Sequence, residues 1–171
     1  MTSSAKGPLV LWLAWALHDV EEALTFPATC EVLAARTGWR AMRMTTPQSW
    51  AAIGLMGVAL AGICERGART DGASRLYRAT VAGLRGHVAT HLLSAAALRS
   101  YTAGCVTALP VMLPGAEVAV RQLREQGYAL EARDYAAGAA LLGPLALGIH
   151  AVVRALPRRG ERRAVRAPAG P

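Results

Sequence analysis

Residues 8–26 read PLVLWLAWALHDVEEALTF and combine a long apolar run with a compact group of ionisable side chains. A helix of about 20 mainly apolar residues is long enough to cross the ~30 Å hydrocarbon core of a bilayer. Pro8 suits the first turn of such a helix, and Pro27 suits its end. We predict a retained membrane helix rather than a cleavable signal peptide, because the apolar core of a signal peptide would not carry Glu21 and Glu22.

Four more apolar segments of helical length follow the first one. They lie at about residues 49–64, 79–98, 102–120 and 135–156. Two prolines, Pro110 and Pro114, predict kinks in the fourth of these segments. The pattern predicts an all-α fold, a polytopic membrane helix bundle of about five transmembrane helices. We expect residues 1–156 to form a single membrane-embedded domain and residues 157–171 to form a basic, disordered tail.

The composition supports a membrane protein and argues against other classes. Of the 171 residues, 53% are hydrophobic and 18% are charged, whereas an ordinary soluble domain is about 25% charged. The net charge of +8 lies mainly in the polar connection 28–49, in the other loops and in the tail. No basic stripe interleaves with aromatic residues, so nucleic-acid binding is not expected.

The same composition suggests where the protein is located. Arginines cluster at residues 154–166, and the positive-inside rule therefore favours a cytoplasmic C-terminus. The richness in Ala, Arg and Gly suggests a bacterial genome, and hence an integral protein of a bacterial cell membrane. The lipid bilayer is the expected partner, and oligomerisation is possible.

All four histidines of the chain fall inside the predicted spanning segments. Ionisable side chains at that depth are costly and usually face the bundle interior or a functional site. His18, Glu21 and Glu22 stand at i, i+3 and i+4, so they share one helix face. His87 and His91 form an i, i+4 pair, the spacing with which two imidazoles on a helix can hold one metal ion.

This internal His/Glu cluster is the predicted site. A divalent metal, zinc or iron, is the suspected cofactor, and its six candidate ligands are His18, Glu21, Glu22, His87, His91 and His150. The same groups could instead perform proton chemistry without a metal, with a buried glutamic acid as general acid. The candidate catalytic residues are Glu21, Glu22, His18 and His91.

Two motifs resemble those of the HXXEE domain proteins, small integral membrane proteins mostly of unknown function. HDVEE at 18–22 matches the naming motif, and HVATH at 87–91 followed by RSYTAGCVTALP at 99–110 matches a downstream element. The resemblance implies functional roles for His18, Glu21, Glu22 and His91. The chain departs from the family pattern at two positions, with His87 in place of Asn and Ala103 in place of Pro.

These observations lead to three functional hypotheses. The first is a membrane-embedded, metal-dependent enzyme that hydrolyses or oxidises a lipid, isoprenoid or polyketide-like apolar substrate. The second is a metal-free isomerase or cyclase that uses Glu and His as acid and base. The third is a non-enzymatic metal-binding or transport subunit.

Overall fold

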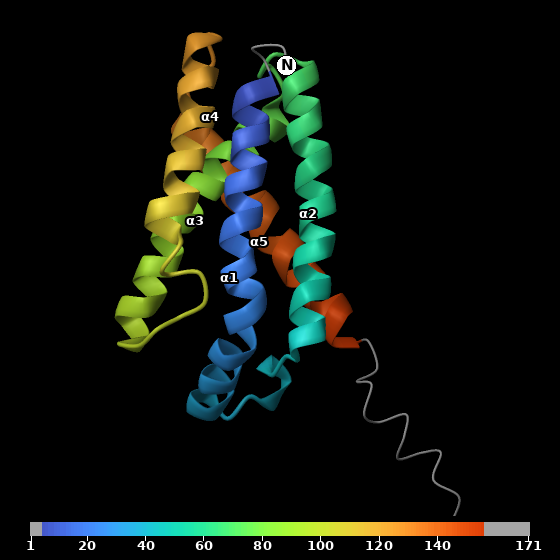
Figure 1. Cartoon of the computed structure of the whole chain (residues 1–171), viewed down its shortest axis with the longest axis vertical. Helices are drawn as coiled ribbons and strands as arrows, with labels where there is room; N and C mark the ends of the chain where they lie inside the picture. Colours follow the sequence, from blue (N-terminus) through green and yellow to red (C-terminus); the bar gives the residue numbers. More distant parts are fainter. Residues whose placement is uncertain (1–4, 156–171) are drawn as a thin grey trace, which may run out of the picture.

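The computed structural model describes residues 5–155, and these residues form helices and connecting loops with no strand among them (Figure 1). The prediction of an all-α fold is confirmed, and the predicted tail 157–171 lies outside the described residues. The helices are α1 (Lys6–Thr37), η2 (Arg40–Met42), α2 (Thr46–Arg69), α3 (Arg75–Leu98), η3 (Ala108–Met112), α4 (Leu113–Glu125) and α5 (Ala132–Ala155).

The first helix is longer than the sequence predicted. Pro27 lies inside α1, which continues to Thr37 and ends at Gly38 in the left-handed conformation. The predicted end at Pro27 and the predicted connection from residue 28 are therefore wrong. Cys30 and Ala34 are buried on the continuation, so tertiary packing outweighs the backbone hydrogen bond that the proline removes.

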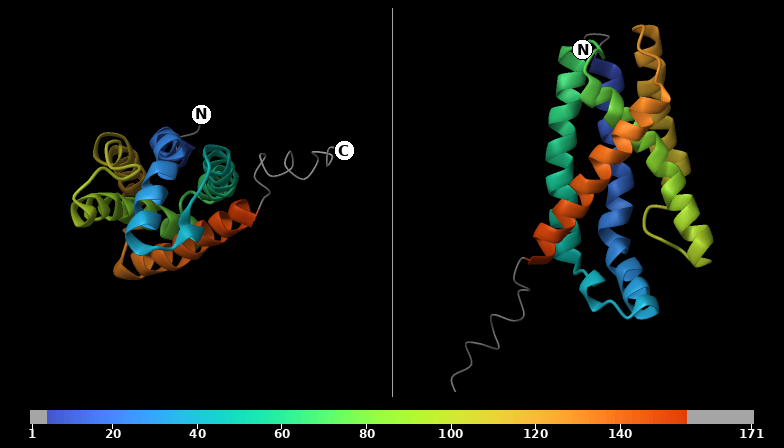
Figure 2. Two further views of the ribbon diagram at one scale, coloured as in Figure 1. Left: turned by 90° about the horizontal axis from the view of Figure 1, so that it is seen from below. Right: turned by 180° about the vertical axis from the view of Figure 1, so that it is seen from behind.

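The helices are arranged in two sets. α1 lies between α2 and α4 and packs against both (Figure 1). α3 and α5 pack on each other and cross obliquely behind α1 and α2 in the view of Figure 1, so they lie in front in the right-hand view of Figure 2. Gly83 of α3 and Gly138 of α5 mark the crossing, where a Cβ on Gly138 would lie 2.7 Å from the Cα of Gly83. Small residues at a crossing let the two backbones approach closely.

A non-helical segment between α3 and α4 reaches the middle of the bundle. After Arg99 caps α3 in the left-handed region, the chain folds back from the end of α3 to the start of η3 (Figure 1). The predicted start of this helix near residue 102 is thus wrong, because residues 103–107 form turns and regular helix begins only after them. Pro110 lies in the π-helical turn η3 and Pro114 in the first turn of α4, as expected for residues that interrupt a regular helix.

Two buried cores hold the bundle on either side of the functional residues. One includes Leu11 and Trp15 of α1 together with Leu60 of α2, and the other joins Cys30 of α1 to Val153 of α5. Along α1, the HDVEE motif lies between these two cores.

Within residues 5–155, two helices, α2 and α5, are long and apolar enough to cross a membrane. The prediction of about five transmembrane helices is therefore not confirmed. Large apolar side chains nevertheless point outward from several helices. Among them, Val58 is 75% exposed, Leu147 73% and Leu93 68%.

Candidate metal centre

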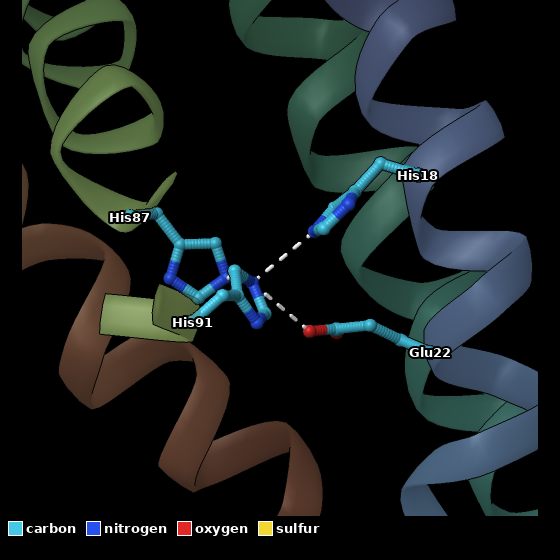
Figure 3. Close-up of side chains that lie close together, drawn as sticks. All are labelled: His18, Glu22, His87 and His91. Atoms are coloured by element: carbon cyan, nitrogen blue, oxygen red, sulfur yellow. Dashed lines mark hydrogen bonds and ion pairs between the residues drawn. The ribbon is translucent and has the colours of Figure 1, made fainter. Parts of the chain in front are cut away.

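Two helices carry the four side chains of the centre. His18 and Glu22 are one turn apart on α1, and His87 and His91 are one turn apart on α3. Residues at i and i+4 lie on the same helix face, and the two pairs point toward each other across the bundle (Figure 3). One ligand atom from each of the four residues lies within 4.8 Å of the other three. The cluster could therefore hold a metal ion.

His91 is at the centre of this group. Its Nε2 lies 3.1 Å from Nε2 of His18 and 2.9 Å from Nε2 of His87. The Oε1 atom of Glu22 lies 3.2 Å from the same nitrogen. His18 is fully buried and His91 is 7% exposed, so water screens little of the charge that the cluster carries.

The outer nitrogens of His91 and His18 have partners that fix their protons. Nδ1 of His91 lies 2.9 Å from the carbonyl oxygen of Ala103, and because a carbonyl only accepts, Nδ1 carries the hydrogen. Nδ1 of His18 lies 2.8 Å from Oγ1 of Thr107. The Thr107 hydroxyl donates to Oε2 of Glu21, so its lone pair accepts the hydrogen of His18.

His87 follows the same pattern through Thr90. The Thr90 hydroxyl donates to the backbone carbonyl of His87 at 2.7 Å. Nδ1 of His87 lies 2.9 Å from Oγ1 of Thr90. Since the hydroxyl has a single proton, the ring nitrogen is the donor.

All three neutral imidazoles therefore direct Nε2 lone pairs at a common point. Lone pairs at this separation repel each other unless a cation or a shared proton lies between them. Histidines that ligate metals show this arrangement, in which the outer N–H is held by a carbonyl, a hydroxyl or a carboxylate. The donor set of imidazole nitrogens and a carboxylate oxygen suits zinc or non-haem iron.

Glu21, a predicted ligand, is directed away from the four-residue cluster. Its carboxylate accepts hydrogen bonds from the backbone N–H groups of Val106 and Thr107 at 3.3 and 2.8 Å, and also from the hydroxyls of Thr107 and Tyr101. Partial burial and the bond to Glu21 raise the pKa of the Tyr101 phenol to about 12, so this phenol remains a donor. Glu21 thus fastens the segment that holds His18 and His91.

Gly104 is a residue of the site that the sequence did not reveal. Its φ of +82° lies in the left-handed region that favours glycine. A Cβ at this position would lie 2.5 Å from Cε1 of His91 and 2.9 Å from Cε1 of His18. Ala103, Gly104 and Thr107 were predicted to lie in a helix, and only the density of small and turn-forming residues in TAGCVT indicated otherwise.

His150, the sixth predicted ligand, is not part of the cluster. Its ring stacks on Phe26 with the centroids 5.0 Å apart. Arg85, also inside a predicted span, pairs with Glu117 at 2.6 Å and donates to the hydroxyl of Tyr135 at 2.8 Å. The structure thus brings together four of the six predicted metal ligands and leaves Glu21 and His150 outside.

A cavity of about 830 Å³ lies beside the centre, within the size range of small-molecule sites. Its walls come from α1, α2, α3, α5 and the turn segment at residues 102–103. Glu22, His87 and His91 reach its surface, together with Asp19, whereas His18 does not line it. A molecule in the cavity would therefore approach the cluster from the side opposite His18.

Comparison with known proteins identifies the HXXEE motif but assigns no activity. No curated protein and no solved structure matches the chain. A family model described as "Protein of unknown function with HXXEE motif" matches residues 9–119. This range contains the whole cluster, the segment that orients it and most of α4. The chain therefore belongs to the HXXEE family.

Proposed function

We propose that this protein is an integral membrane enzyme that depends on a divalent metal ion and acts on a lipid, isoprenoid or polyketide-like substrate. The observation that carries the proposal is the convergence of the three Nε2 atoms of His18, His87 and His91, each with its outer nitrogen held by a protein group. When bound, zinc or iron would supply a Lewis acid and would activate water for hydrolysis or oxygen for oxidation.

The outer surface of the bundle supports a membrane location. Only 11% of the most apolar 18-residue stretch of α5 is buried inside the protein. The core helix of a soluble protein would be mostly buried. Leu147 on α5 and Val58 on α2 are among the most exposed apolar residues. Large exposed apolar side chains of this kind fit contact with lipid.

We further propose that all five α-helices cross or enter the bilayer, with the basic C-terminus in the cytoplasm of a bacterial cell. Part of the charge that lowers the hydropathy of α3 and α4 is paired between helices, because Arg85 of α3 forms an ion pair with Glu117 of α4. The non-helical stretch 102–107 has its backbone bonded to Glu21 and Thr29, and such backbone is tolerated at membrane depth where protein surrounds it.

The coordination preferences of the two metals give Glu22 different roles. Catalytic zinc keeps three protein ligands and one open position, so with zinc the three histidines would bind the ion and Glu22 would act as the base for water. Iron accepts more ligands, so with iron Glu22 would join the histidines and positions would remain open toward the cavity. In both cases a substrate in the cavity would approach the metal from the wall formed by Glu22, His87 and His91.

Metal analysis of the purified full-length protein tests this proposal. We expect close to one equivalent of zinc or iron in the wild type and its loss in His87→Gln and His91→Gln. His150→Gln is the matched control, because His150 lies outside the cluster, and it should retain the metal. A wild type without stoichiometric metal, or equal metal content in all variants, would overturn the proposal.

A second candidate is a metal-free isomerase or cyclase. It is favoured by two carboxyl groups, those of Asp19 and Glu22, that line the same largely apolar cavity. In that case turnover would survive chelation and would be lost in Glu22→Gln. A non-enzymatic metal-binding or transport subunit would instead take up metal in proteoliposomes and turn over no apolar substrate.

A further inference from the structure

The cavity contains a carboxyl group that the metal centre does not use. Asp19 is 5% exposed and lines the cavity. Among residues 5–155 it has no hydrogen-bond or ion-pair partner. A buried carboxyl without a partner is costly. An unsatisfied group of this kind at a cavity wall indicates a ligand that completes its hydrogen bonding.

A second polar group without a partner lines the same cavity, away from Asp19. His150 lines it, and its ring lies flat against Phe26. Nδ1 of His150 is buried and has no partner in the described part of the chain. Its Nε2 also has no hydrogen bond to any of the described residues. His150 therefore has hydrogen-bonding capacity left for a molecule in the cavity that it lines.

The distance between Asp19 and His150 can be measured along α1, because the ring of His150 stacks on Phe26 of that helix. Asp19 and Phe26 are seven residues apart, and at 1.5 Å per residue this is about 10 Å, or two helical turns. The remaining wall is mainly apolar and includes Ile53 and Met56. Among the described residues that line the cavity, none is Lys or Arg, so a phosphate group would find no cationic side chain there.

We infer that the cavity binds an elongated, uncharged molecule with an apolar body and two oxygen functions about two helical turns apart. A hydroxyl forms a hydrogen bond with the Asp19 carboxyl beside the metal centre, and a second hydroxyl or a carbonyl forms one with His150. This inference deepens the proposed function and rests on it for the chemistry at the first oxygen. It favours hydroxylated isoprenoids and polyketide-like chains over hydrocarbons.

Binding of four matched probes to the full-length protein in nanodiscs tests the inference. The probes are tetradecane, tetradecanol, a tetradecanol with a second hydroxyl near mid-chain, and tetradecyl phosphate. A net hydrogen bond is worth about 0.5–1.5 kcal/mol, so the diol should bind roughly 2- to 13-fold tighter than tetradecanol. In protein stripped of metal, tetradecyl phosphate should bind more weakly than tetradecanol, because no Lys or Arg is among the described residues that line the cavity.

Two variants test whether Asp19 and His150 cause the preference for the diol. His150→Phe keeps the stacking on Phe26 and removes the nitrogens, and Asp19→Leu keeps the size and removes the carboxyl. Each should abolish the preference for the diol, leave tetradecane binding unchanged and retain the metal content of the wild type. Equal binding of diol and alcohol by the wild type, or a preserved preference in both variants, would overturn the inference.

The outcomes separate this inference from the proposed function. A diol preference in a protein without stoichiometric metal would support the two-point cavity and refute the metal enzyme. A metal-loaded protein that does not distinguish the probes would refute the cavity inference alone.

Discussion

Replacing Thr107 by valine tests the connection between the turn segment and the metal centre. Valine has nearly the same shape, so the substitution removes the hydroxyl that accepts from Nδ1 of His18 at 2.8 Å and donates to Glu21. Without it, His18 can rotate and can adopt the other tautomer, which would place a hydrogen on Nε2. Loss of an outer partner of a metal-ligating histidine costs about 10–100-fold in metal affinity, which corresponds to roughly 1.4–2.7 kcal/mol.

The assay is a competition titration of zinc between the protein and a chelating indicator. Thr25→Val is the matched control, because Thr25 lies near Glu21 and bonds Tyr101 at 3.2 Å but contacts none of the histidines. We expect Thr107→Val to weaken zinc binding by the stated factor and Thr25→Val to leave it near the wild-type value. Unchanged affinity in Thr107→Val, or an equal loss in both variants, would refute the reasoning.

Three further predictions concern the backbone at Gly104, the pH dependence of metal binding and the exposed face of α5. Gly104→Ala should lower the melting temperature and abolish metal binding, because a Cβ would collide with His91 and His18 and left-handed backbone costs an L-residue about 1–2 kcal/mol; thermal unfolding and metal analysis measure both. Metal content should fall on acidification to well below about pH 6.5, the ordinary pKa of histidine, because protons must compete with the bound metal for the Nε2 lone pairs; metal that stays bound on dialysis into strong acid would contradict the assignment. Leu147→Arg places a charge on the exposed face of α5 and should impair membrane insertion by about 2.5–3.5 kcal/mol, whereas unaltered membrane fractionation would argue against lipid contact at this face.

Helical periodicity was sufficient to predict part of the site. The i, i+4 spacings of His18 with Glu22 and of His87 with His91 are local properties of a helix. Each spacing predicts that its two side chains share a face. The cost of ionisable groups in apolar helices then predicts that these faces point inward, and the structure places the two pairs opposite each other.

The sequence could not separate Glu21 from Glu22. Both follow His18 within one turn, and neighbouring residues on a helix point about 100° apart. Which carboxyl group reaches the histidines therefore depends on how α1 is rotated against α3, a tertiary property. The partner of Glu21 is the turn segment before η3, and small residues in that segment gave little indication that it would leave the helix.

The extent of α1 and the position of His150 also depended on packing. Pro27 is a local signal for a helix end, but burial of Cys30 and Ala34 continues the helix past it. His150 lies in an apolar segment like the other three histidines. Because α5 crosses the bundle obliquely (Figure 2), the position of His150 along α5 places it beside Phe26 rather than in the cluster.

X-ray absorption spectroscopy of the metal-loaded, full-length protein tests the central claim most directly. The four-residue centre of His18, Glu22, His87 and His91 predicts scattering from three imidazole rings. For zinc, the nitrogens should lie at about 2.0–2.1 Å. A spectrum with no imidazole scattering, or with the same scattering in His91→Gln as in the wild type, would contradict it.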